Sequence, residues 1–219
     1  IRTDVGATSS IVFSYFMELE VPIKGDMAAT LLYAIETDLA GAAGTPGELD
    51  QVALSSLTLM ADNRKLYQMR YVDLSQGYFV AYANGLANAA YWENGTSGAV
   101  LSHIESIDSM EQPAVIADFL LRFDKVQWAL VTAVHENKLI LSIRTSNTSK
   151  LTAADMARRV LRTIGEGGGH RTKAGGFIKL TTGSVAEVDR LREMVRRRYL
   201  RSLGIKGQRG QKLVPNRTA

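Results

Sequence analysis

One short segment limits the local structure of this chain more than any other. Gly167–Gly176 holds five glycines in ten residues, and three of them are consecutive. Glycine loses more backbone entropy on folding than any other residue, so a run this dense points to a special conformation. We predict a loop between a helix and a strand, in which backbone N–H groups can approach an anion without Cβ atoms in the way.

Three donor side chains lie in the same segment. His170 and Lys173 offer point donors, whereas Arg171 offers a planar fork that can hold two oxygens at once. This combination suits a phosphate better than an uncharged ligand. No Lys-Ser or Lys-Thr pair ends the segment, so it is not a Walker-type phosphate loop. The alternative is a flexible turn without a ligand, which accounts for the glycines but not for the donors.

Composition excludes several classes of site. The chain has 219 residues, is 46% hydrophobic and contains no cysteine, so it can build a core but no disulfide, zinc-thiolate site or cysteine nucleophile. The lack of cysteine suits the cytoplasm, which is the expected location. No apolar run is long enough for a membrane span, so no membrane partner is expected. The chain opens on Ile1 rather than on Met, and we expect a further segment upstream.

Helical periodicity dominates the first part of the chain. Ile11, Val12, Tyr15, Phe16 and Leu19 form one apolar stripe of a predicted helix. A second helix is predicted from Asp26 to Asp38. A third begins at a capping box between Thr45 and Glu48, with a proline at its first position. We therefore expect residues 1–61 to be helical, followed by a linker helix over 62–77.

Strands and helices alternate after residue 77. Strands are predicted at 78–83, 87–93, 99–104, 128–134, 138–144 and 174–180, and helices near 113–123, 152–164 and 184–203. The fold class is thus α/β, with a helical first part and a mixed α/β domain over 78–204. A basic tail over 205–219 is expected to be disordered from residue 208.

Positive charge is concentrated at the C-terminal end. From Arg190 onward there are ten Lys or Arg residues and one acid, Glu193. Such a block either attracts polyanions or is simply a solvated helix face followed by an unstructured tail. The charge block alone does not separate these two interpretations.

The glycine segment also resembles a known family. Gly-Gly-Gly-His over 167–170, followed by small residues and glycine, is the hallmark of the type-one DHH-associated domain. This domain forms the C-terminal half of DHH phosphoesterases, such as RecJ-like nucleases and NrnA-like oligoribonucleases, and it occurs in alanyl-tRNA synthetases. Three further stretches match in order, and the resemblance covers about residues 1–203. Residues 4–10 resemble the family's segment that follows its Asp-His-His motif. Residues 31–38 resemble its fourth metal-binding motif, and residues 142–146 resemble the segment whose Arg binds substrate phosphate.

The resemblance implies a fold and a function. Residues 1–61 would be the C-terminal part of a DHH domain, and 78–204 a DHH-associated substrate-binding domain. The intact protein would be a metal-dependent phosphoesterase that hydrolyses short oligonucleotides or phosphorylated nucleotides with two Mn²⁺ or Mg²⁺ ions. Asp38 would be one metal ligand. The residues that would bind substrate phosphate are Arg144, Gly167, Gly168, Gly169, His170, Arg171 and Lys173, and no catalytic residue is assigned.

Departures from the family pattern limit what this chain can do alone. It contains no Asp-His-His sequence, and among the family's metal ligands only Asp38 matches. Lys173 stands where the family usually has Ala. His103 and His135 show no metal-ligand spacing and are expected to be structural or solvated. We therefore expect this chain by itself to be inactive, and a nucleic-acid-binding module without catalysis is the alternative. The oligomeric state is not predicted, and a homodimer is compatible with the sequence.

Overall fold

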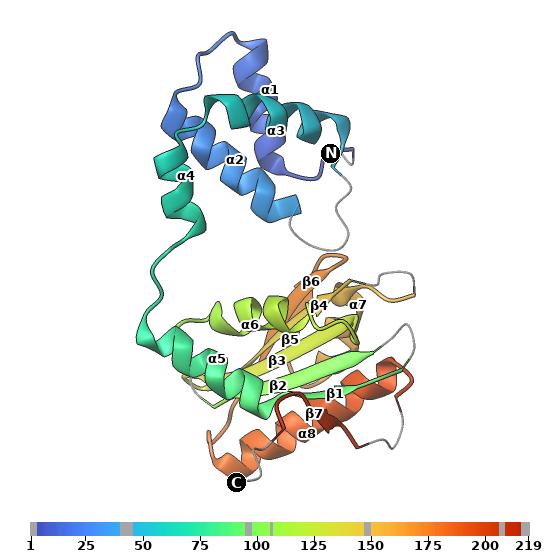
Figure 1. Cartoon of the computed structure of the whole chain (residues 1–219). Helices are drawn as coiled ribbons and strands as arrows, with labels where there is room; N and C mark the ends of the chain where they lie inside the picture. Colours follow the sequence, from blue (N-terminus) through green and yellow to red (C-terminus); the bar gives the residue numbers. More distant parts are fainter. Residues whose placement is uncertain are drawn as a thin grey trace. The chain divides into compact units, whose positions relative to one another are not determined.

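The computed structural model describes residues 4–39, 46–94, 98–105, 107–146, 150–205 and 209–215. The chain divides into two compact units, Ile1–Asp73 and Leu74–Ala219 (Figure 1). Each unit has its own hydrophobic core. Among the helices of the described residues, none is long and apolar enough to cross a membrane.

The described residues of unit 1 form four helices. They are α1 (Thr8–Glu18), α2 (Gly25–Leu39), α3 (Glu48–Met60) and α4 (Asn63–Arg70). α2 packs against the other three, and its Leu32 and Ile35 are buried together with Phe13 and Leu57. α4 ends at Arg70 and the next helix begins at Gln76, so the predicted linker region over 62–77 is not one continuous helix.

The carboxylate of Asp50 ties the start of the chain to α3. Asp50 is fully buried and accepts hydrogen bonds from Gly6 N at 2.7 Å, Ser10 Oγ at 2.6 Å and Gly47 N at 2.8 Å. A longer bond comes from Ala7 N. Burial acts to raise the pKa of Asp50, but these bonds together hold the pKa below its ordinary value. The predicted capping partner Thr45 lies outside the described residues, and Asp50 provides the acidic end of the cap instead.

The apolar stripe of α1 is not the side of the helix that is buried in this unit. The buried residues of α1 are Ser10 and Phe13, whereas Tyr15 is 56% exposed and Leu19 is 73% exposed. The hydrogen bond from Ser10 to the buried Asp50 turns the Ser10 and Phe13 side of the helix inward. The periodic pattern correctly predicted the helix but not the side that packs within this unit.

Unit 2 is a seven-stranded mixed sheet with helices on both faces. The strand order is β5-β6-β4-β3-β2-β1-β7, in which β2 and β3 are parallel and the other neighbours antiparallel. Its elements in chain order are α5 (Gln76–Asn88), β1 (Ala90–Trp92), β2 (Ala99–Ile104), α6 (Gln112–Leu120), β3 (Trp128–His135), β4 (Lys138–Thr145), α7 (Ala153–Leu161), β5 (Glu166–Gly169), β6 (Lys173–Lys179), α8 (Val185–Ser202) and β7 (Gln211–Lys212).

Side-chain alternation along the strands divides the core of this unit into two clusters. Val131 and Ile104 face α5 and α6, whereas Leu141 and Ile143 face α7 and α8. Figure 1 shows α5 and α6 on one side of the sheet and α8 on the other. The α/β class is thus confirmed, with a helical first part and a mixed sheet after it.

The predicted strand over 78–83 is wrong, because these residues belong to α5. Tyr78, Phe79 and Val80 have side chains that are common in strands, but Phe79 and Val80 are largely exposed here. Ala81 and Gly85, four residues apart, are the buried positions of the helix. A Cβ at Gly85 would lie 3.1 Å from Ile116, so small residues allow α5 to lie close to α6.

The C-terminal tail is partly ordered, in contrast to the prediction. Gln211 pairs with Tyr91, so β7 extends the sheet next to β1, and Leu213 packs against the α5–α6 cluster. A Cβ at Gly210 would lie 2.5 Å from the indole of Trp92, so the chain here lies against that side chain. Residues 216–219 lie outside the described residues.

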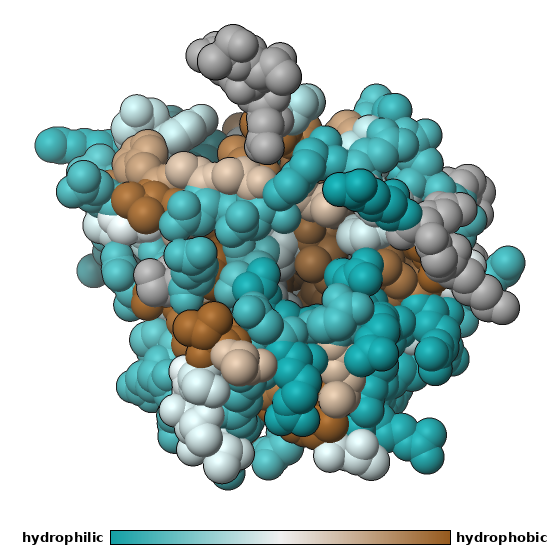
Figure 2. All heavy atoms as spheres, turned by 90° about the horizontal axis from the view of Figure 1, so that it is seen from below, coloured by the Kyte–Doolittle hydropathy of each residue, from teal (hydrophilic) through white to brown (hydrophobic). Residues whose placement is uncertain are grey.

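The basic helix α8 neutralises part of its own charge. Arg192 pairs with Asp189 at 3.2 Å and Arg196 with Glu193 at 2.7 Å. Arg198 Nη1 donates to Val160 O and to Arg162 O at the C-terminal end of α7, where a cation is favoured. Figure 2 shows the face that carries α8 covered mostly by hydrophilic side chains.

Candidate functional site

The glycine segment is a β-hairpin, not the predicted loop. β5 and β6 pair antiparallel, with Gly167 opposite Gly176 and Gly168 opposite Gly175. At the tip, His170 N donates to Lys173 O at 2.8 Å. Glycines normally weaken a strand, and here β5 is a short edge strand beside α7. The strand is held by β6 on one side and by the close approach of α7.

Backbone hydrogen bonds fix the tip of this hairpin. Ala153 N donates to Arg171 O at 2.8 Å, and Ala154 N donates to His170 O at 3.0 Å. Both donors belong to the first turn of α7, where backbone N–H groups have no partner within the helix. Thr145 N at the end of β4 donates to Thr172 O. The tip carbonyls therefore use the helix N–H groups that could otherwise bind an anion, so any anion at this tip would depend mainly on side chains.

Strand register places the remaining donors on one face. Arg144 of β4 pairs with Lys173 of β6, and Ser142 pairs with Gly175. Residues two apart in a strand share a face, so Arg144, Ser142, Lys173 and Gly175 all lie on the side of α6. They line a hollow of about 450 Å³ together with Gly168 and residues of α6.

Arg144 is held in a fixed orientation. Its side chain is 12% exposed, and Nε donates to Asp118 Oδ1 of α6 at 2.7 Å. Nη1 donates to Ser142 Oγ and to Ile143 O, each at 3.1 Å. Among the described residues, no hydrogen bond is made by Nη2. Two edges of the guanidinium are thus used for positioning, and the Nη2 edge remains for a ligand.

The hairpin glycines fall into two structural classes. A Cβ at Gly167 or Gly176 would lie 2.4 or 2.3 Å from Leu161 Cδ1 of α7, so packing requires glycine at both positions. At Gly168, on the opposite face, a Cβ would meet no atom within 4 Å, and at Gly175 it would meet only Leu141 O at 3.3 Å. Packing does not require glycine at Gly168. The missing side chain there leaves the floor of the hollow as bare backbone.

Comparisons with known proteins agree with this architecture. No family model matches the chain. An exopolyphosphatase-related protein from Bacteroides fragilis superposes with a TM-score of 0.67 over 92% of this chain and 59% of that protein, at 16% identity. The chain shares the fold of this protein, which agrees with the resemblance to the DHH superfamily noted from the sequence.

Two other similarities are more distant or partial. An uncharacterized protein of Methanocaldococcus jannaschii is 26% identical over 211 residues, which are 94% of this chain and 42% of that protein. RecJ from Thermus thermophilus in complex with Mg²⁺ is 13% identical, with a TM-score of 0.43. This similarity extends over 85% of this chain and 37% of RecJ. The chain spans less than two thirds of the length of each of these three proteins.

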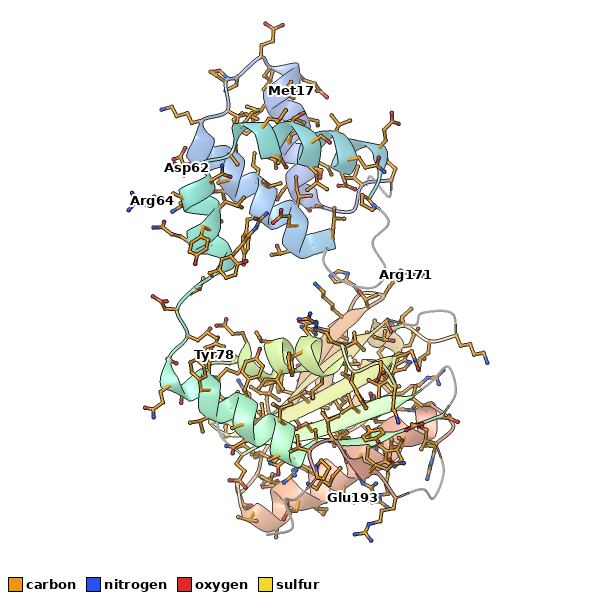
Figure 3. The ribbon with its side chains drawn as sticks, viewed as in Figure 1. Met17, Asp62, Arg64, Tyr78, Arg171 and Glu193 are labelled. Carbon is orange, nitrogen blue, oxygen red and sulfur yellow. The ribbon has the colours of Figure 1, made fainter. Side chains whose placement is uncertain are left out.

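The other predicted site residues lie at different places in this fold. Lys173 lines the hollow, and His170 and Arg171 are exposed at the hairpin tip, where Figure 3 labels Arg171. Asp38 lies in the last turn of α2 in unit 1, with an exposed side chain. Within the described residues, no group of three His, Asp or Glu side chains could hold a metal ion.

His103 is structural, as expected. It is buried and its Nδ1 lies 3.0 Å from Thr132 Oγ1. Burial and the nearby Arg192 lower the pKa of His103 to about 4, so the ring is neutral at pH 7. Two residues that shape the hollow carried no signal in the sequence. Asp118 is far from Arg144 in sequence, and Phe177 borders the hollow only because of the register between β4 and β6.

Proposed function

We propose that this chain is the substrate-binding part of a metal-dependent phosphoesterase that acts on short oligonucleotides or phosphorylated nucleotides. One observation carries the proposal. The Nη2 edge of Arg144 and the ammonium group of Lys173 stand in register on one face, at the end of a hollow with a glycine floor. An oxygen-rich anion can accept hydrogen bonds from both groups and approach the bare backbone.

Fixed donors suit this role because they are oriented before the ligand arrives. Asp118 and Ser142 hold the guanidinium of Arg144, so little side-chain entropy is lost on binding. A phosphate gripped here would orient the rest of the substrate. Holding reactants in a productive geometry can account for a large share of a rate enhancement. Arg144 and Lys173 are therefore proposed as phosphate-binding residues, with His170 and Arg171 near the same end of the hairpin.

The metal ions that the resemblance implies do not fit the described residues alone. Mn²⁺ and Mg²⁺ need several hard oxygen ligands. In the described part of the chain, Asp38 does not belong to any group of three acidic or histidine side chains that could hold a metal ion. We propose that Asp38 supplies one ligand in the intact protein and that the other ligands come from outside these residues. No chemical step is assigned to this chain.

The same observation favours a second candidate, a nucleic-acid-binding module that does not catalyse. Both candidates need the phosphate site at Arg144, but only the first needs Asp38. In the full-length protein, Asp38→Ala should lower turnover strongly and change substrate affinity little. Absence of turnover by the unsubstituted full-length protein would favour the second candidate, whereas an unchanged turnover number in Asp38→Ala would refute the role of Asp38.

Calorimetric titration of this chain with a 5′-phosphorylated dinucleotide tests the phosphate site. Charged hydrogen bonds contribute roughly 1.5–3 kcal/mol each, so the double variant Arg144→Ala, Lys173→Ala should bind well over tenfold more weakly. Arg201→Ala on α8 removes an exposed cation from the other face of the sheet and should bind like the unsubstituted chain. Unchanged affinity in the double variant would refute the site.

A hydrolysis assay with added Mn²⁺ tests the division of labour. The chain should bind the dinucleotide and release no product. Turnover by this chain would contradict the assignment of the missing metal ligands to another part of the protein.

A further inference from the structure

The face that carries Arg144 continues beyond the glycine floor to a second group of cations. Along β4 the residues on this face are Arg144, Ser142, Ile140 and Lys138, and along β6 they are Lys173, Gly175, Phe177 and Lys179. Lys138 pairs in register with Lys179 and with His135 of β3. The β4–β6 strip thus has two cations at each end and uncharged residues between them.

A second hollow lies at the far end of this strip. It measures about 290 Å³ and its lining includes Glu166, Phe177 and Lys179. Phe177 also lines the first hollow, so the two hollows are neighbours. Lys138 Nζ lies 5.3 Å from the centre of the Phe177 ring. Among the described residues, neither Lys138 nor Lys179 forms an ion pair.

The two pairs of cations are too far apart to bind one phosphate. Arg144 and Lys138 are separated by six residues of one strand, or about 20 Å at roughly 3.4 Å per residue. A stacked nucleic-acid strand rises about 3.4 Å per nucleotide. A strand of up to about six nucleotides, or fewer when its bases unstack, would reach from one pair to the other.

We propose that Lys138 and Lys179 form a second phosphate-binding site, so that the β4–β6 strip binds a short single strand by two of its phosphates. The proposal rests on the proposed function in one respect, since the first pair of cations also holds a phosphate. Proteins bind single strands without sequence preference by combining a cationic groove with an aromatic ring on which a base stacks. Phe177 lies on β6 between Lys173 and Lys179 and on the same face, so we assign the stacking of a base to its ring.

Two acidic residues near the second hollow suggest how the nucleic-acid strand lies there. Glu166 is in register with Phe177 and lines the second hollow, and Glu136 lies in the turn between β3 and β4. A carboxylate repels phosphate but accepts hydrogen bonds from a sugar hydroxyl or a base amino group. The sugar and base therefore lie beside Glu166, while phosphates lie beside Lys138 and Lys179.

The test is fluorescence anisotropy with 5′-phosphorylated oligonucleotides from dinucleotide to hexanucleotide, without divalent metal. The unsubstituted chain should bind the hexanucleotide at least tenfold more tightly than the dinucleotide. The double variant Lys138→Gln, Lys179→Gln should lose this gain and still bind the dinucleotide normally. For the hexanucleotide, the logarithm of the binding constant falls linearly with the logarithm of the salt concentration. The slope for this variant should be shallower by about 0.7 for each phosphate that it no longer binds.

Control variants separate this proposal from general electrostatics. Arg190→Gln, Arg201→Gln removes two exposed cations from α8 and should preserve the length dependence. Phe177→Leu should weaken the hexanucleotide several-fold but not inorganic polyphosphate. If polyphosphate binds as tightly as the hexanucleotide and Phe177→Leu changes neither, the ligand is not a nucleic-acid strand.

The outcomes also distinguish this inference from the proposed function. Failure of the unsubstituted chain to bind any 5′-phosphorylated oligonucleotide would refute both. Dinucleotide binding that does not strengthen with length, or a length gain that survives the loss of Lys138 and Lys179, would refute the second site alone.

Discussion

Alanine substitutions at two hairpin glycines should have opposite consequences. In Gly176→Ala, the new Cβ would lie 2.3 Å from Leu161 Cδ1 and 2.4 Å from Glu166 O. Leu161 can rotate, but the carbonyl belongs to the neighbouring strand, so β5 and β6 must move apart. Overpacking of this kind costs about 1–3 kcal/mol. In a unit of this size each kcal/mol lowers Tm by roughly 2–4 °C, which gives a decrease of about 2–12 °C.

Gly168→Ala should leave the fold intact. A Cβ there meets no atom within 4 Å, and alanine loses less backbone entropy than glycine in a strand, so the free energy of unfolding should stay equal or rise by up to about 1 kcal/mol. The methyl group would nevertheless stand on the floor of the hollow and weaken binding of the dinucleotide.

Thermal and urea denaturation followed by circular dichroism, together with titration of the dinucleotide, measure both effects. Equal Tm values for the two variants would refute the division of glycines into packing and binding classes. So would a Gly168→Ala variant that binds the dinucleotide as tightly as the original chain.

Four further predictions concern stability. Asp50→Ala leaves several buried donors without an acceptor and should lower the free energy of unfolding by at least about 3 kcal/mol in urea denaturation. Because folding lowers the pKa of Asp50, the carboxylate should stabilise the fold above its ordinary pKa of about 3.9, and this stabilisation should be lost as pH falls below that value. Denaturation curves of Asp50→Asn at several pH values should lack this pH dependence. Glu187 accepts three backbone N–H bonds that lower its pKa to about 2, so Glu187→Gln should reduce the stability difference between pH 7 and pH 3. Deletion of residues 209–219 removes β7 and the packing of Leu213 and should lower Tm, and an unchanged Tm would mean that this strand adds nothing to unit 2.

Local signals in the sequence predicted the elements that depend on local interactions. The capping box of Thr152 and Asp155 at the start of α7 can be read from the sequence, because cap and partner lie within four residues. The prediction for α5 was wrong because residues 78–80 are typical of strands, whereas contacts with distant parts of the chain stabilise a helix here. Their helical state depends on Ala81 and Gly85 meeting α6 and β2, which no local pattern encodes.

The candidate site was predictable only in part. The glycine motif indicated where an anion could bind, and the resemblance added Arg144. Which residues share a face was not predictable, because it depends on the register of β4 with β6, and a shift of one residue reverses every side chain. The positioning of Arg144 by Asp118 depends on how α6 packs on the sheet.

The anchored hairpin tip has a consequence for the kinetics of association. Three backbone hydrogen bonds from Ala153, Ala154 and Thr145 already hold residues 170–172. A mobile loop would lose about 1–2 kcal/mol of backbone entropy per residue on closing over a ligand, and here that loss has occurred during folding. Binding then needs no slow isomerisation. The observed association rate should rise linearly with nucleotide concentration, without the plateau that a closing loop produces.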